Sequence, residues 1–351
     1  MRVVTFFAAG MLHEGSLVQH DGALRLLEEP APTGAPRLDG IVTGLFTDHH
    51  VHLQLVDHAL LAGSRLGRVV DLGADLGWIA GIARGTRMDS AGSGGYAASV
   101  SIRDDGARMD SAGSWAVRPA ESIRPVAVDY AGPFLTAAGG YPSDRAWAPE
   151  GAVREIPDAA SAGPVVDELA AAGASVIKIV ANSDAGPVID DETFAAIVRA
   201  ARAHDLPAVA HAEGAGQAQR AVRLGASRLA HAPFSERLTD DEIAEQAASA
   251  SWISTLAVHD DAARAIAIDN VRRFCTAGGT VLYGSDMGNG DTPVDLRDSE
   301  IAALRDAGVD GIPLLRALDP LSPLTPGAAL LVLPAGDPAL ARRLSPADLE
   351  V

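Results

Sequence analysis

Residues that could bind a metal are crowded into one short stretch of the chain. The segment GLFTDHHVHLQL, residues 44–55, holds three histidines and one aspartate within five positions, although the 351 residues include only ten histidines. Imidazole is the commonest protein ligand for metals, and its charge changes near neutral pH. His50 and His52 are two residues apart, so in a strand both imidazoles lie on the same face. The stretch predicts a metal site at a strand end. His49 has the opposite parity and is expected to pack behind it.

Other candidate ligands occupy later strand-like runs. They are Lys178 in SVIKIV, His211 in LPAVAH, His231 in SRLAH and Asp286 in TVLYGSD. Each has an ordinary explanation when taken alone, such as a hydrogen-bonded core histidine or a buried lysine paired with a carboxylate. Taken together, imidazoles and a carboxylate at successive strand ends suit Zn²⁺. His204, in RAHDLP, is expected at the surface.

The elements that would position these residues alternate along the chain. Short β-branched runs are followed by alanine-rich segments such as DDETFAAIVRAARAHD, which has acids in its first turn and basic residues in its last. The runs are residues 41–46, 68–73, 125–130, 175–180, 206–211, 227–231, 252–258 and 280–286. This alternation predicts an α/β fold, a (β/α)₈ barrel over residues 41–324 whose carboxyl strand ends carry the site. A doubly wound open sheet is the alternative, but GADLG lacks the spacing of its glycine-rich first turn.

The two ends of the chain fall outside this alternation. Residues 1–40 and 325–351 contain strand-like pieces between proline and glycine, which predicts a small β domain built from both termini. The heptapeptide RMDSAGS occurs at 87–93 and again at 108–114. Two copies are too few for a solenoid. We expect a surface insertion near residues 85–118, on the barrel face away from the chemistry.

Composition limits the partners and the compartment. A formal net charge of −18 disfavours nucleic acid and anionic membranes, so a small-molecule substrate is expected. Cys275 is the single cysteine, so no internal disulfide can form, and no apolar run approaches the roughly 20 residues that span a bilayer. We expect a cytoplasmic protein that could form a homo-oligomer.

The pattern of motifs resembles the amidohydrolase superfamily of metal hydrolases. DHHVH looks like the D-x-H-x-H element of the first strand. GASVIKIV, AVAHAEG, GASRLAHAPF and YGSDMGN look like the elements of strands 4, 5, 6 and 8, in the right order. The resemblance covers roughly residues 40–320, and six ligand positions in the correct order make it specific.

The resemblance implies a role for each ligand. His50 and His52 would hold one metal with Asp286, and His211 and His231 would hold a second. Lys178, carboxylated on its amine, would bridge two Zn²⁺ or other divalent ions. Asp286 would also move the proton from the attacking metal-bound hydroxide to the departing nitrogen. A neutral Lys178 beside a single metal remains the alternative.

The implied activity is hydrolysis of a C–N bond in a small cyclic amide, an N-acyl amino acid or a dipeptide. A mononuclear, imidazolonepropionase-like cyclic amidohydrolase is an alternative, as is a lactone or ester hydrolase on the same scaffold. A non-catalytic scaffold that has lost its metals belongs to a different class. Intact ligands at all six positions argue against it.

Residues for substrate binding come from two segments. The loop YAGPFLTAAGGYPSDRAWAP follows the third strand and gathers aromatic residues in a chain with only 4% of them. Such a loop can form a pocket wall or a packed Ω-loop. The candidates for substrate contact are Tyr130, Phe134, Tyr141, Arg145 and, after the last strand, Asn289.

Overall fold

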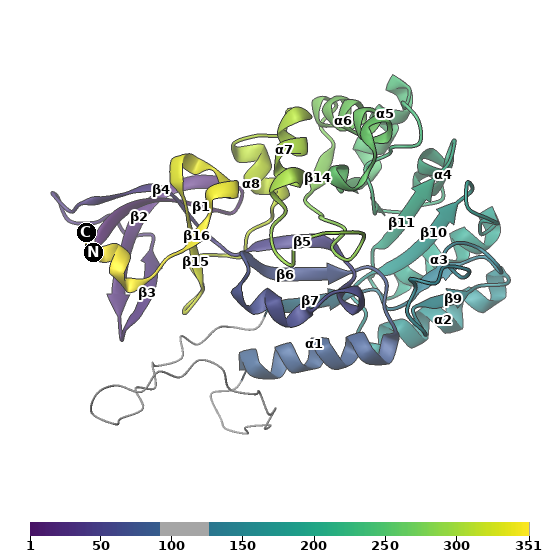
Figure 1. Cartoon of the computed structure of the whole chain (residues 1–351), viewed down its shortest axis with the longest axis horizontal. Helices are drawn as coiled ribbons and strands as arrows, with labels where there is room; N and C mark the ends of the chain where they lie inside the picture. Colours follow the sequence, from purple (N-terminus) through teal and green to yellow (C-terminus); the bar gives the residue numbers. More distant parts are fainter. Residues whose placement is uncertain (92–125, 351) are drawn as a thin grey trace.

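Two parallel sheets form the centre of the computed structural model, which describes residues 1–91 and 126–350 (Figure 1). The smaller sheet has the order β5-β6-β7, with strands Phe46–Val51, Leu66–Asp71 and Ala127–Tyr130. The larger has the order β14-β13-β12-β11-β10-β8-β9. Its strands are β8 Phe134–Thr136, β9 Val153–Glu155, β10 Ile177–Asn182, β11 Ala208–Glu213, β12 Arg228–Leu229, β13 Ser251–Ile253 and β14 Thr280–Leu282. The predicted α/β fold with parallel strands is confirmed.

The two sheets touch at two places. On one side Val51 bridges to Met287, and the His52 amide donates to the Met287 carbonyl at 2.7 Å. On the other side the Ser175 amide, just before β10, donates to the Tyr130 carbonyl at the end of β7, at 2.9 Å. Both sheets also contribute to one buried apolar cluster, made of Val70, Leu72, Ala131, Val176, Val209, Ala230 and Ile253. The carboxyl ends of the strands therefore face a common region.

Eight α-helices are present in the described ranges and pack around these sheets. They are α1 Leu76–Ala91, α2 Ala159–Ala172, α3 Asp191–Ala203, α4 Gln217–Arg223, α5 Asp240–Ser249, α6 Asp261–Thr276, α7 Asp298–Asp306 and α8 Ile312–Ala317. Their starts follow the sequence chemistry: the Asp190 side chain caps α3 by accepting from the Thr193 amide, and Thr239 and Glu242 form a capping box on α5. None of the helices in the described part is long and apolar enough to cross a membrane.

Both ends of the chain enter a third, six-stranded sheet, which lies at one end of the molecule (Figure 1). Its order is β16-β15-β4-β1-β2-β3. The strands are β1 Arg2–Ala8, β2 Met11–His20, β3 Ala23–Leu27, β4 Arg37–Gly44, β15 Leu330–Leu333 and β16 Arg342–Arg343. The sheet is the structural counterpart of the terminal β unit predicted from the sequence.

The first predicted strand, residues 41–46, is divided between two sheets. Gly44 pairs with Leu330 in the terminal sheet, whereas Phe46 pairs with Leu66 and begins β5. The change of sheet occurs at Leu45. The preceding residue must be small, because a Cβ added to Gly44 would lie 2.1 Å from the Leu321 carbonyl oxygen. An unbroken apolar run gives no sign of such a switch, so the prediction of one strand over 41–46 was wrong.

Further segments differ from the sequence prediction. The run 280–286 is a strand only over Thr280–Leu282, and the predicted loop after the third strand contains β8. The run 252–258 is a strand only to Ile253, because Thr255 adopts a positive φ of 43° and leads into a 3₁₀ turn over Leu256–Val258. Helix α1 continues to Ala91, so it includes the first residues of the first RMDSAGS copy, which we expected in an insertion. The second copy lies outside the described residues.

Candidate metal centre and its cavity

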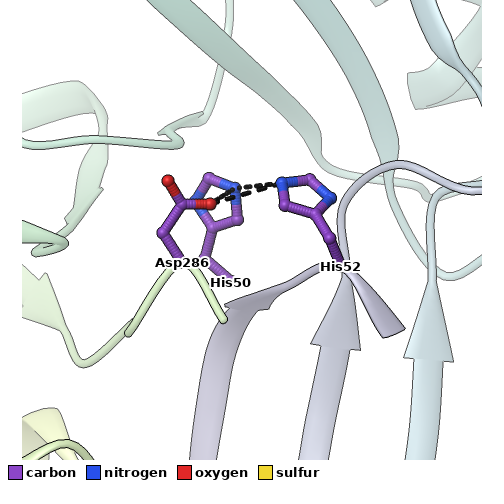
Figure 2. Close-up of side chains that lie close together, drawn as sticks. All are labelled: His50, His52 and Asp286. Carbon is purple, nitrogen blue, oxygen red and sulfur yellow. Dashed lines mark hydrogen bonds and ion pairs between the residues drawn. The ribbon is translucent and has the colours of Figure 1, made fainter. Parts of the chain in front are cut away.

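Three side chains converge at the carboxyl ends of the strands (Figure 2). The Nε2 atoms of His50 and His52 are 3.2 Å apart, and they lie 3.2 and 3.3 Å from Oδ1 of Asp286. In the described part of the chain these are the three His, Cys, Asp or Glu side chains whose ligand atoms fall within 4.8 Å of one another. All three are buried.

The spacing of these atoms matches the coordination shell of zinc. Tetrahedral Zn²⁺ with bonds of about 2.0–2.1 Å separates its ligand atoms by roughly 3.3 Å. The three separations observed here are 3.2, 3.2 and 3.3 Å. Two imidazole nitrogens and one carboxylate oxygen are also a donor set that zinc accepts. The residues present therefore fit a divalent metal.

Neighbouring carbonyl groups orient the two imidazoles. Nδ1 of His50 lies 2.8 Å from the Ala230 carbonyl oxygen, and Nδ1 of His52 lies 3.4 Å from that of Gly73. A carbonyl can only accept, so Nδ1 carries the hydrogen and Nε2 keeps its lone pair for a metal. Burial lowers the pKa of His50 well below its usual 6.5, which keeps this ring neutral. Neutral imidazole is the form that binds metal.

The carboxylate of Asp286 is held by its own loop. Asn289 donates its Nδ2 to Oδ2 of Asp286 at 2.8 Å, which leaves Oδ1 facing the two imidazoles. Burial opposes ionisation of Asp286, but the contacts with His50 and His52 outweigh it and hold the pKa well below its usual 3.8. The residue has a φ of +53°. Such strain is uncommon outside glycine and is concentrated at functional sites.

Lys178 lies in β10, is 1% exposed and lines the same cavity. Burial lowers the pKa of its amine from 10.5 to about 7, against the opposing influence of Asp286 and Asp71. It is also the only lysine in the sequence, and all the other residues among the 28 Lys and Arg are arginines. A buried amine that is half neutral near pH 7 is a nucleophile rather than a fixed cation.

His211 and His231 reach the cavity but have other partners. The ring centroid of His231 is 4.7 Å from that of His50 and 4.8 Å from that of His211, and its Nδ1 lies 2.8 Å from the Thr255 hydroxyl. Nε2 of His211 instead lies 3.0 Å from Oε2 of Glu213. The structure thus brings all six predicted ligands into one cavity, and His211 faces Glu213 rather than the other five.

The cavity has a volume of about 400 Å³ and an aromatic wall. Of the predicted substrate contacts, Phe134, Tyr141 and Asn289 line it. Trp147 lies beside Phe134 and Tyr141, with ring centroids 6.2 and 6.0 Å away, and Phe234 lies near His231. The loop after β7 therefore forms a wall of the cavity.

Two predicted contacts are placed elsewhere. Tyr130 is 1% exposed in the main apolar core, and its hydroxyl donates to the Ala172 carbonyl of α2 at 2.5 Å. Successive side chains of a strand point to opposite faces, and its neighbour Ala131 belongs to the inner cluster, so Tyr130 points to the helix layer. The guanidinium carbon of Arg145 lies 5.5 Å from the centroid of the Tyr141 ring, and its Nε pairs with Asp144 at 3.3 Å. Neither residue lines the cavity.

His49 and His204 lie outside the cavity, as their parity and position suggested. His49 has its Nε2 3.4 Å from Oδ2 of Asp319, and burial lowers its pKa. His204 follows α3, is 37% exposed and pairs with Asp167 at 2.6 Å.

Two polar residues of the cavity went unrecognised in the sequence. Glu213 is two residues after His211, so its parity could have indicated the same face. His259 follows the 3₁₀ turn after β13 and stacks on Phe234 with a centroid distance of 4.0 Å. Its Nε2 is buried and has no hydrogen-bond partner among the described residues. No local sequence pattern marks this position.

The chain is similar to known proteins in its structure but not detectably in its sequence. No protein-family model matches the sequence, and no curated protein matches it either. Among solved structures it is similar to an ochratoxinase from A. niger, with a TM-score of 0.65 and 15% identity over 97% of this chain and 91% of that chain. A Xaa-Pro dipeptidase with methionine in its active site gives 0.64 and 14% over 95% and 93%. An amidohydrolase gives 0.61 and 17% over 95% and 91%.

The chain therefore has the fold of solved amidohydrolase and dipeptidase structures. This is the fold that the sequence motifs implied. Fold alone does not fix a substrate or a reaction.

Proposed function

We propose that this protein is a metal-dependent hydrolase that cleaves a C–N bond in a small amide. The observation that carries the proposal is the convergence of His50 Nε2, His52 Nε2 and Asp286 Oδ1 at separations of 3.2–3.3 Å. These atoms lie at the bottom of an aromatic-walled cavity, which is the usual form of a small-molecule site. The similar solved structures, an ochratoxinase, a dipeptidase and an amidohydrolase, support the same class.

The fold that we propose for the two parallel sheets is one (β/α)₈ barrel. Hydrogen bonds join β5 to the segment after β14 and β7 to the segment before β10, so both seams have contacts. The apolar cluster shared by both sheets would be the interior layer of this barrel. The site would then occupy the carboxyl face, where barrel enzymes carry their chemistry.

The proposed metal ligands form two sets. His50, His52 and Asp286 would hold one divalent ion, and His211 and His231 would hold a second. Lys178, carboxylated by CO₂, would bridge the two ions. The lysine fits this role because its depressed pKa leaves about half of the amine neutral at pH 7, and a neutral amine is what reacts with CO₂. Arginine, which serves at all other basic positions, cannot form this group at neutral pH.

Zinc, when bound, lowers the pKa of water toward neutrality and polarises an amide carbonyl. Asp286 would accept the proton of the attacking water on its carboxylate and return it to the departing nitrogen. Asn289 would hold the other carboxylate oxygen during this transfer. Phe134, Tyr141 and Trp147 would exclude bulk water and position the apolar part of the substrate. A small cyclic amide, an N-acyl amino acid and a dipeptide are all short enough for a cavity of about 400 Å³.

One observation favours a second candidate, a mononuclear enzyme of the imidazolonepropionase type. In the described part of the chain, the ligand atoms of His50, His52 and Asp286 form the group within 4.8 Å of one another, and His211 and His231 do not belong to it. In this version Lys178 stays a neutral amine and only His50, His52 and Asp286 hold an ion. Metal stoichiometry separates the two candidates.

The test is metal content followed by turnover. Protein purified with zinc and bicarbonate should contain close to two zinc ions per chain, or one in the mononuclear version, and should hydrolyse members of a panel of amides and lactams. His50→Ala should lose metal and activity, whereas His204→Ala, a surface histidine paired with Asp167, should lose neither. A folded protein that binds no metal under these conditions would exclude the hydrolase proposal.

A further inference from the structure

The charges on the cavity wall are unbalanced. Apart from the proposed ligands, Glu213 is the charged side chain among the described residues that line the cavity. The rest of the wall is apolar, aromatic or uncharged, and none of its described members is an arginine. A substrate with a free carboxylate would therefore meet an anion on the wall and no guanidinium to bind it.

Glu213 is held in position by two contacts. Its Oε2 accepts from Asn182 Nδ2 at 2.7 Å and lies 3.0 Å from His211 Nε2, while Oε1 takes part in neither contact. A held carboxylate with an oxygen to spare accepts hydrogen bonds from N–H groups and repels other carboxylates.

Arg145 is the nearest candidate for binding a substrate carboxylate, but its charge is already engaged. It lies over Tyr141 and pairs with Asp144, and it is absent from the lining of the cavity. Tyr141 itself lines the cavity and stacks with His211 at 5.6 Å. Tyr141 thus contributes to the place where a substrate would bind, and the Arg145 guanidinium does not.

From the charges on the cavity wall, we propose that the substrate is an amide that carries no carboxylate. The part of the substrate beside Glu213 is uncharged or carries a protonated amine. This inference rests on the proposed hydrolase function and narrows it. It removes dipeptides and N-acyl amino acids with a free carboxylate from the substrate classes. Neutral cyclic amides and amides of aromatic amines remain, and the wall of Phe134, Tyr141 and Trp147 suits an aryl group.

The experiment uses three acetanilides that share one scissile bond and differ only in the para substituent: methyl, aminomethyl and carboxylate. With the zinc-loaded full chain, we expect kcat/KM for the carboxylate compound to be at least tenfold below that for the methyl compound, and the aminomethyl compound to equal or exceed the methyl one. Glu213→Gln keeps the size of the side chain and should reduce this discrimination to less than threefold. Glu168→Gln, which removes a surface carboxylate paired with Arg154, is the matched control and should leave it unchanged.

Three outcomes would overturn the inference. The first is equal or better turnover of the carboxylate compound by the wild type. The second is unchanged discrimination in Glu213→Gln, and the third is loss of metal in that variant, which would make Glu213 a ligand instead. If zinc is bound but neither these three compounds nor any member of the amide and lactam panel is hydrolysed, the proposed function fails. Binding then decides the inference. Trp147 lines the cavity, so quenching of tryptophan fluorescence should report binding of the three compounds. The methyl and aminomethyl compounds should bind more tightly than the carboxylate compound.

Discussion

The buried amine of Lys178 should destabilise the metal-free protein. In the folded chain burial lowers its pKa from 10.5 to about 7, and in the unfolded chain it titrates at its ordinary value. Between these two pH values the unfolded chain binds one proton more than the folded chain, so the free energy of unfolding rises with pH. Each pKa unit corresponds to about 1.4 kcal/mol, so the full difference is about 5 kcal/mol.

The perturbation that removes this effect is Lys178→Met, which keeps a long unbranched side chain of similar size in the same space. At pH 7 and below, the metal-free variant should exceed the wild type by up to about 5 kcal/mol in free energy of unfolding. The difference should shrink by about 1.4 kcal/mol per pH unit above pH 7 and vanish near pH 10.5. The variant should be inactive in the binuclear mechanism.

The assay is urea denaturation of both proteins at pH 6, 7, 8 and 9, after chelation and in buffer free of CO₂. Lys178→Arg is the control, because it keeps a buried cation and should be no more stable than the wild type. Equal stabilities of wild type and Lys178→Met at pH 7, with unchanged denaturant slopes, would refute the reasoning that burial of this amine is costly. A stabilised variant with normal metal content and turnover would instead support the mononuclear mechanism.

Three other substitutions test separate parts of the structure. Asp286→Asn should lower kcat by about 10²–10⁴-fold, because an amide cannot accept and return a proton, and should reduce zinc content much less. His49→Ala should lower kcat by only about 10–100-fold. If His49→Ala lowered kcat more than Asp286→Asn, another residue would transfer the proton. His259→Phe preserves the stack on Phe234 but removes the buried Nε2. If Nε2 binds substrate, KM should rise about 3–10-fold with little change in kcat. An unchanged KM would show that Nε2 does not contact substrate. Burial raises the pKa of Glu300 above 4.5, so the folded chain binds the extra proton and the free energy of unfolding should fall as pH rises from 4.5 through that raised value. Glu300→Gln should make this slope smaller in urea titrations, and an identical slope would contradict the prediction.

The sequence was a good guide to residues whose position follows from strand order and parity. His50 and His52 share a face because they are two apart in β5, and Asp286 reaches them because β14 is followed by a segment that bonds back to β5. The resemblance to a known family gave the order of the ligands. Tyr130 packs against α2 whereas the next residue, Ala131, belongs to the apolar cluster shared by both sheets, and aromatic clustering in the sequence does not distinguish these two sides.

The remaining features depend on contacts between distant parts of the chain. His259 enters the cavity because a 3₁₀ turn after β13 stacks it on Phe234, 25 residues earlier, and neither residue has a local signal. The hydrogen bond between His211 and Glu213 depends on side-chain rotation, which a strand pattern does not specify. The change of sheet at Leu45 is hidden for a similar reason, since the apolar run continues through it.

The solitary lysine has a consequence for measurement. Since Lys178 is the only lysine, the chain has a single ε-amine, and that amine lies in the cavity. A protein labelled with ¹⁵N-lysine should give one side-chain resonance, whose titration reads the state of the site directly. In ¹³C-bicarbonate, carboxylation of this amine should add one carbonyl signal that disappears in Lys178→Met, apart from any carbamate on the α-amine. Amine-directed reagents should likewise modify the metal-free protein at this one side chain and be blocked when the site is carboxylated and filled, so reactivity toward them becomes a gauge of occupancy.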